Sequence, residues 1–291
     1  MEWVTSLVGP FQVDSHFAHG HGYSKLWRLM TSTRPLWLKL HTYPGKWAGE
    51  VHALLNWASQ TVPSPEVVGY RDQPPSLLMS EVPGTIATEI ELDREAEMRL
   101  WRQAGQYLAE LHRKQNAWFG AALPNGSPQG ETFTDAAAFV RESLETRIAR
   151  GTEQGLWTEE EYAFIVAATP EWTASLEGET PVAIHRDFGP RNWFTDPTGT
   201  LTAVIDWEHA RWDVQAADLN RPWDDAFVAK PHLAAPFEEG YGGFTPRLKT
   251  QIQALRLLGA VGGVVWATSV KDWDYVTLNR AALQRLRPPF S

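Results

Sequence analysis

The first 84 residues alternate between apolar and polar positions in short runs, a pattern that predicts a small sheet. Runs of four to eight residues with a period of two, bounded by Gly and Pro, are typical of antiparallel strands. One longer stretch instead has apolar residues three and four apart, as a helix requires. We expect strands within 3–17, 26–30, 36–41, 67–70 and 76–81, with a break at Gly9-Pro10, and one helix over 46–60.

The remainder of the chain has mainly helical periodicity, most clearly over residues 91–114. Two short apolar strands, 181–184 and 201–205, interrupt it. A Pro83-Gly84 break directly follows the last strand of the first part and is typical of a hinge. We therefore predict an N-terminal lobe over 1–84 and a C-terminal lobe over 85–291. Further helices are expected at 134–150, 158–176, 227–234, 246–270 and 275–286.

Composition limits the class of protein. Of the 291 residues, 43% are hydrophobic and 21% are charged, as in ordinary globular chains, and the absence of cysteine excludes disulfides and thiolate metal sites. A net charge of −9 argues against a nucleic-acid-binding surface. The apolar stretch 257–267 is too short for a membrane span, and the N-terminus lacks the basic and apolar regions of a signal peptide. We expect a cytoplasmic protein with neither nucleic acid nor membrane as a partner.

Candidate chemistry is concentrated between Val182 and Asp213. Residues 185–192 read HRDFGPRN and match H-R-D-x-x-x-x-N, the pattern of a kinase catalytic loop. Asp206 stands at the end of the second apolar strand, in the segment Ile-Asp-Trp-Glu. Because the two strand ends are expected to adjoin, Asp187, Asn192 and Asp206 would share one site.

These residue types suit phosphoryl transfer, in which the protein mainly positions groups and neutralises charge. Asp187 is the carboxylate expected beside an acceptor hydroxyl, where it would act as base. Asn192 and Asp206 offer the oxygen ligands that Mg²⁺ prefers. His185 and Arg186 are expected to brace the catalytic loop, and Asp218, further on, is expected to be structural.

Lys39 lies in the middle of an apolar run, where a lysine needs an anionic partner. We predict that it faces the nucleotide phosphates and that Glu50, in the first turns of the next helix, pairs with it. The alternatives are that Lys39 and His41 share the solvent face of a strand and that Glu50 is an exposed residue at a helix start.

Two weaker signals concern nucleotide contacts. Gly20, Gly22 and Ser24 belong to the loop His-Gly-His-Gly-Tyr-Ser between two strands, whose backbone N–H groups could meet phosphates. Two glycines in a hairpin are also common turn chemistry. Glu81 and Val82 precede the hinge, where their backbone would meet a purine edge.

Together these motifs resemble the aminoglycoside phosphotransferase and choline kinase-like family, relatives of the protein kinases. The resemblance rests on HRDFGPRN and VIDWEHA, with support from WLKLH and LLMSEVPG, in the family's order over roughly residues 10–220. It implies an α+β, bilobal protein-kinase-like fold, with a small antiparallel β N-lobe that carries one main helix and a larger, mostly helical C-lobe. It also implies Mg²⁺-dependent transfer of the γ-phosphoryl group of ATP or GTP to a small-molecule hydroxyl.

The leading hypothesis is an antibiotic O-phosphotransferase that confers resistance. The alternatives are a metabolic kinase for choline, homoserine or a sugar, and a pseudokinase without catalysis. The presence of Lys39, Asp187, Asn192 and Asp206 together favours catalysis. No motif marks the acceptor pocket; its candidate residues are the acids Asp213, Asp224, Asp225, Glu238 and Glu239 and the aromatic residues Trp223, Trp266 and Trp273.

Overall fold

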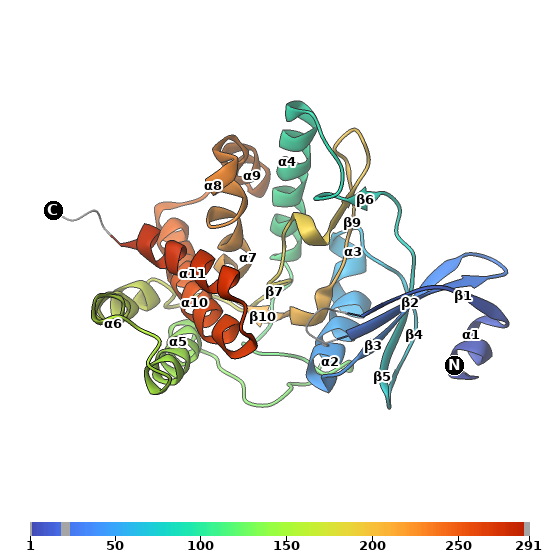
Figure 1. The fold of residues 1–291 in the computed structure, drawn as a ribbon, viewed down its shortest axis with the longest axis horizontal. Coiled ribbons are helices and arrows are strands. Elements are labelled where there is room, and N and C mark those ends of the chain that lie inside the picture. Colours follow the sequence, from blue (N-terminus) through green and yellow to red (C-terminus); the bar gives the residue numbers. More distant parts are fainter. Residues whose placement is uncertain (1, 19–23, 288–291) are drawn as a thin grey trace.

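The alternating pattern of the N-terminal segment builds a five-stranded antiparallel sheet. A computed structural model describes residues 2–18 and 24–287 of the chain. The strands lie in the order β1-β2-β3-β5-β4, at the right of Figure 1. Their bounds are β1 Phe11–Ala18, β2 Ser24–Thr31, β3 Pro35–His41, β4 Val67–Asp72 and β5 Pro75–Ser80.

One face of this sheet is covered by a helix, α1 (Glu2–Val8), where a strand was predicted. That part of the strand prediction was wrong. Val4 is 1% exposed and belongs to a small apolar cluster with Leu36 and Leu38 of β3. Leu7 follows Val4 by three residues and Trp3 by four, so one helical stripe faces the sheet. The glycine at position 69 lets Leu7 approach it.

The opposite face is covered by α2 (Pro44–Ala53), which continues through a π-helical turn, Leu54–Ala58, into α3 (Ser59–Thr61). This is the helix predicted over 46–60. Trp47 and Val51 share the main core with Leu77 and Met79 of β5. Because side chains alternate across a strand, Leu38 points to the α1 side while Lys39 lies on the α2 side.

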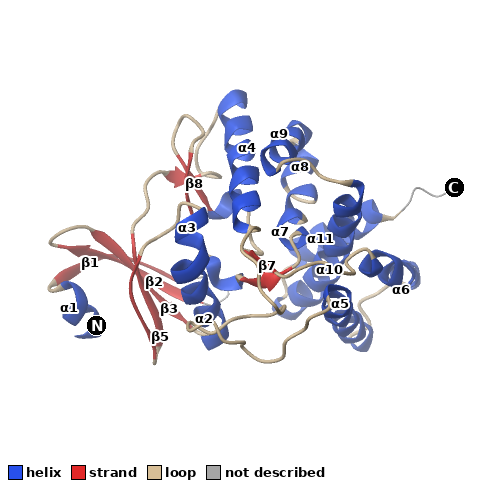
Figure 2. Ribbon diagram, turned by 180° about the vertical axis from the view of Figure 1, so that it is seen from behind, coloured by secondary structure: helices blue, strands red, loops and turns tan. Residues whose placement is uncertain are grey.

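Helices dominate the second part of the chain, as Figure 2 shows. Trp101 packs its ring against Trp193, Phe227 and Phe237 at centroid distances of 4.8, 5.1 and 5.6 Å, which joins three helices and a strand in one core. The helices are α4 Arg94–Leu111, α5 Ala136–Glu153, α6 Glu159–Ala174, α7 Ala216–Leu219, α8 Ala226–Ala229, α9 Ala234–Tyr241, α10 Pro246–Val270 and α11 Trp273–Leu286.

Helix α10 is the longest helix of the part of the chain that the structure describes, at 25 residues, and the predicted range 246–270 is confirmed. By length and composition alone it could cross a membrane, but 61% of its most apolar window is buried inside the protein. It packs against α5, α6, α7 and α11. Its apolar character therefore serves the core of the C-terminal part.

Short strands carry the catalytic segment. β7 (Val182–Ile184) pairs with β10 (Arg211–Asp213), while β8 (Trp193–Thr195) lies between β6 (Thr85–Ile86) and β9 (Leu201–Val204). The two strands expected to adjoin, β7 and β9, thus belong to separate sheets. Loop contacts bring their ends together instead.

The hinge region packs closely on the second part of the chain. Gly84 has φ +101°, and a Cβ there would lie 2.6 Å from Thr202 Oγ1 and 2.7 Å from the carbonyl oxygen of Thr195. Only glycine combines this backbone conformation with so close an approach. We keep the proposed boundary between the lobes at residues 84 and 85.

Helices α4 and α9 are in backbone contact, which generates a stability prediction. A Cβ at Gly240 would overlap the carbonyl oxygen of Arg102. We expect Gly240→Ala to lower the free energy of unfolding by about 1–3 kcal/mol, because the helices must separate. The measurement is urea unfolding followed by circular dichroism. Gly259→Ala is the matched control: it lies on the exposed face of α10, so the higher helix propensity of alanine should stabilise the protein.

Candidate active site

The catalytic loop is held by a buried carboxylate. Asp218 of α7 is 2% exposed and accepts hydrogen bonds from the backbone N–H groups of His185, at 2.8 Å, and Arg186, at 2.5 Å. Arg186 has φ +67°, so the chain turns sharply there. Asp218 therefore has the structural role that the sequence suggested. His112 of α4 lies against it, with Nε2 at 3.4 Å from the carboxylate.

His185 braces the loop from inside. Its ring is fully buried; Nε2 donates to the carbonyl oxygen of Ile205 at 2.9 Å, and Nδ1 accepts from the N–H of Asp187 at 3.1 Å. Burial lowers the pKa of His185 below its usual value of 6.5. A ring that accepts at Nδ1 and donates at Nε2 is neutral, with its proton on Nε2.

Asp187 and Asn192 lie at the two ends of the same loop. Asn192, in the 3₁₀ turn Pro190–Asn192, donates from Nδ2 to the carbonyl oxygen of Asp187 at 2.9 Å. The Asp187 side chain is 24% exposed and forms an ion pair with Arg221. The guanidinium of Arg221 thus orients Asp187, the candidate base. No sequence motif pointed to Arg221 for this role.

Asp206 follows β9 and is turned toward the N-terminal sheet by a left-handed backbone, with φ 64° and ψ 58°. The N–H of Ile205 donates to the carbonyl oxygen of Asn192 at 2.9 Å, which joins this segment to the catalytic loop. Asp206 Oδ1 lies 2.6 Å from Lys39 Nζ. Burial alone would raise the pKa of Asp206, but the charge of Lys39 outweighs it and holds the pKa well below the usual range.

Lys39 is the centre of a buried ion-pair network. Its side chain is 4% exposed, and Nζ lies 2.9 Å from Glu50 Oε2, 2.6 Å from Asp206 Oδ1 and 3.3 Å from Glu208 Oε2. Burial would lower the pKa of Lys39, but the three carboxylates raise it further than burial lowers it. The predicted pair with Glu50 is present in the structure, and the alternative of a solvent-facing Lys39 is wrong because both residues are buried.

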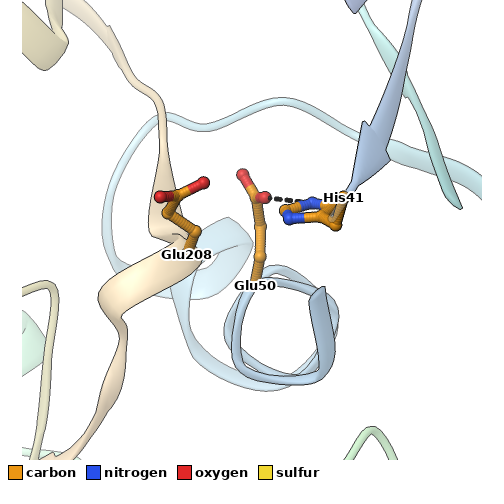
Figure 3. A group of neighbouring side chains, drawn as sticks. All are labelled: His41, Glu50 and Glu208. Atoms are coloured by element: carbon orange, nitrogen blue, oxygen red, sulfur yellow. Dashed lines mark ion pairs between the residues drawn. The ribbon is translucent and has the colours of Figure 1, made fainter. Parts of the chain in front are cut away.

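Two members of this network were missed. His41 is 3% exposed, and its Nε2 lies 2.9 Å from Glu50; Glu208 also binds Lys46 at 2.6 Å. Figure 3 shows Glu50 between Glu208 and His41. The sequence pattern could have identified both residues. Glu208 belongs to the Ile-Asp-Trp-Glu motif, and His41 lies two residues after Lys39, on the same face of the strand.

The potential ligand atoms of His41, Glu50 and Glu208 lie within 4.8 Å of one another, as a metal site would require. The ammonium group of Lys39, however, contacts both carboxylates. A second cation there would be repelled by Lys39, so this cluster holds the lysine in place. Asp206 and Asn192, at the neighbouring loop ends, are the oxygen donors that fit a magnesium ion.

The remaining nucleotide candidates lie on the N-terminal sheet or beside it. Glu81 and Val82 follow β5 directly, and Glu81 forms an ion pair with Arg28, at 2.5 Å, and accepts from the indole N–H of Trp37. Arg28 lowers the pKa of Glu81. Ser24 begins β2 and is 3% exposed, whereas Gly20 and Gly22 lie outside the described residues.

Most of the acidic acceptor candidates are engaged by basic side chains. Asp213 pairs with Arg211, Asp224 with Arg256 and Arg285, Glu238 with Lys249 and Glu239 with Arg102, while Asp225 is exposed. Of the tryptophans, Trp223 packs against the core and Trp273 is 61% exposed. Trp266 lines an open pocket of about 650 Å³ between α5, α10 and the start of α2.

The buried neutral His185 generates a pH prediction. Its folded pKa lies below that of the unfolded chain, so between the two values only the unfolded state takes up the proton. The stability contributed by neutral His185 is complete above pH 6.5 and decreases as the pH falls, by roughly 1.4 kcal/mol per pH unit. Urea unfolding from pH 7.5 to pH 5 measures this slope.

The substitution His185→Gln keeps a hydrogen-bond donor and an acceptor but removes the titration, so it should flatten the slope. His16→Gln, at an exposed position of β1, serves as the control. Equal slopes for the wild type and His185→Gln would contradict the assignment.

Comparison with solved structures identifies proteins that share the overall fold. The structure of aminoglycoside phosphotransferase APH(4)-Ia matches 98% of this chain and 96% of its own, with 17% identity and a TM-score of 0.75. A candidate fructosamine-3-kinase from Thermobifida fusca YX-ER1 has 21% identity and a TM-score of 0.71 and covers 97% of this chain and 98% of its own. The GDP and kanamycin complex of APH(2")-IIia has 14% identity and a TM-score of 0.69, with 97% and 96% covered.

These likenesses confirm the predicted bilobal α+β fold. No curated protein sequence matches the chain significantly. The profile of the phosphotransferase enzyme family (APH) matches residues 18–255, which is most of the chain. On this evidence, the protein belongs to the APH phosphotransferase family and is a phosphotransferase enzyme.

Proposed function

We propose that the protein transfers the γ-phosphoryl group of ATP or GTP to a hydroxyl group of a small molecule. The observation that supports this most strongly is that candidate catalytic residues from both parts of the chain lie in contact with one another. Asp187, Asn192 and Asp206 come from two loops, and Lys39 and Glu50 come from a strand and a helix of the other part of the chain. Contacts of 2.6–2.9 Å join Asp206 to Lys39, Lys39 to Glu50, and Asn192 to the backbone of Asp187.

In this proposal each side chain has one task. Lys39, fixed by Glu50, neutralises the nucleotide phosphates. Asp187 orients the acceptor hydroxyl and accepts its proton as the new oxygen–phosphorus bond forms and the bond to the leaving nucleoside diphosphate breaks. Arg221 holds the Asp187 carboxylate in place. His185, Arg186 and Asp218 keep the loop in the geometry that these steps need.

Asn192 and Asp206 would hold Mg²⁺, because their oxygen donors suit a hard cation. When bound, the ion neutralises charge on the phosphates during transfer. Asp206 is already turned toward Lys39, so the group that would hold the metal and the group that would hold the phosphates lie next to each other.

For the acceptor, we propose an antibiotic first, since aminoglycoside complexes are among the solved structures with this fold. A metabolic kinase acting on choline, homoserine or a sugar would use the same catalytic loop. The aromatic wall of the pocket, with Phe133, Phe139 and Trp266, suits a ring-containing acceptor.

The test is a nucleotide-turnover assay with Mg²⁺ and either ATP or GTP, over a panel of antibiotics, choline, homoserine and sugars. We expect one compound class to stimulate turnover and to gain one phosphoryl group by mass spectrometry. Asp187→Asn should lower kcat by about 10²–10⁴-fold, with nucleotide affinity retained, because it removes the base. Unchanged turnover in this variant would remove Asp187 from the mechanism.

The Lys39 network generates a second prediction. Lys39→Met leaves three carboxylates close together without their cation, so nucleotide affinity should fall much more than acceptor affinity, and the free energy of unfolding should fall by about 3–5 kcal/mol. Isothermal titration with Mg·AMP-PNP and urea unfolding measure the two effects. Lys249→Met is the matched control, because this lysine is 52% exposed in the C-terminal part. A variant that lost acceptor affinity alone would place Lys39 outside the phosphate site.

A further inference from the structure

The pocket between α5, α10 and the start of α2 has a largely aromatic wall. Its volume of about 650 Å³ is in the range that holds a drug-sized molecule. The aromatic residues that line it are Tyr43, Phe133, Phe139 and Trp266. Aromatic side chains hold flat rings through offset-stacked and edge-to-face contacts. The wall of this α5–α10 pocket therefore suits a ligand with rings better than a flexible chain.

The charged residues of the α5–α10 pocket do not suit a polycation. Glu142 is the one carboxylate among the described residues that line it, against two arginines, Arg147 and Arg150. The guanidinium of Arg147 is held at the side of the pocket, because it donates to the carbonyl oxygen of Ser143. A ligand with several ammonium groups would leave most of them beside a guanidinium and without an anionic partner, which is unfavourable.

A series of side-chain contacts connects the wall of this pocket to the candidate base. The ring of Trp266 meets the ring of Tyr275 edge to face, with 5.7 Å between the centroids. The Tyr275 hydroxyl lies 3.5 Å from Nη2 of Arg221, and Nη1 of Arg221 forms the ion pair with Asp187. The side chains of Asp187 and Arg221 are 24% and 34% exposed, so the series reaches solvent at its catalytic end.

Hydrogen bonds to the backbone hold the elements that carry this series. The side chain of Asn220, the residue before Arg221, donates to the carbonyl oxygen of Leu255 in α10 at 2.9 Å. In α11, Asn279 is buried and donates from Nδ2 to the carbonyl oxygen of Tyr275 at 2.7 Å. Helices α10 and α11 also pack along each other. The pocket wall is therefore held in place relative to the turn that carries Arg221.

We propose that the α5–α10 pocket is the acceptor site and that the acceptor is a neutral or singly charged hydroxyl compound with a flat ring system. The ring packs on Trp266, and the hydroxyl is directed along Tyr275 and Arg221 toward the base. Tyr275 is then a positioning residue, because it acts on Asp187 through Arg221 while its ring supports the pocket wall. This inference rests on the proposed function and names the acceptor class within it, in preference to an aminoglycoside.

The experiment compares the affinities of defined probes for the full chain. The protein is first saturated with Mg·AMP-PNP, which occupies the nucleotide site, and each probe is then titrated by calorimetry. Chloramphenicol and puromycin carry hydroxyl groups and flat rings, the first without charge and the second with one amine. Kanamycin and hygromycin B are the polycationic probes, and glucose is a neutral compound without a flat ring. We expect the two aromatic probes to bind about tenfold more tightly than the others, or better.

Two variants test the named residues. Trp266→Leu keeps an apolar side chain but removes the ring face, so it should weaken binding of the aromatic probes about tenfold. Trp273→Leu is the matched control, because this tryptophan is 61% exposed and lies outside the pocket wall. Neither variant should change the affinity for Mg·AMP-PNP, which also verifies folding.

Tyr275→Phe keeps the ring against Trp266 and removes the hydroxyl beside Arg221. With the acceptor that the turnover panel identifies, it should lower kcat by about threefold to tenfold and leave KM unchanged, because the base is less well oriented while the pocket is intact. A tyrosine that only packs would leave kcat unchanged.

The proposal is wrong if neither aromatic probe binds, if a polycation or glucose binds most tightly, or if Trp266→Leu leaves the affinity for the aromatic probes unchanged. Failure of the proposed function would look different. In that case the protein would not bind Mg·AMP-PNP, or would bind it without turnover of any compound in the panel, whatever Trp266→Leu does to the affinity for the probes.

Discussion

The site depends on one buried cation, Lys39, held by three carboxylates from two different segments of the chain. Glu50 comes from α2, and Asp206 and Glu208 follow β9, so the interaction joins the sheet-rich part of the chain to the helical part. A buried lysine is tolerated only when its charge is compensated, and each of these carboxylates likewise needs the lysine. The relative position of the two parts therefore depends on the ion pairs of Lys39, and a nucleotide phosphate bound to Lys39 would change these ion pairs.

A second buried charge, Asp218, sets the geometry on the other side of the site. Its carboxylate accepts two backbone N–H groups of the catalytic loop, and Arg186 turns with a left-handed backbone beside it. His185 and the link from Ile205 to Asn192 then fix the two loops to each other. Rigid support of this kind matters because catalysis by positioning loses efficiency with small displacements of the reacting groups.

The two sides of the site differ in charge. Lys39 is surrounded by three acids, whereas on the other side Asp187 and Asp213 are each paired with an arginine. Shared folds do not imply shared acceptors, because specificity resides in the side chains around the pocket.

The sequence alone determined the parts that depend on local pattern: the strands from Phe11 to Ser80, the helix over 246–270, and the motif residues Asp187, Asn192 and Asp206. Period-two and period-3.6 spacing carries that information directly. The N-terminal helix was misread because a seven-residue stretch offers too few turns to separate the two periods. Only the tertiary structure decided which charges meet. Lys39 with Asp206 and Arg221 with Asp187 join residues far apart in the chain, and such contacts depend on how the elements pack.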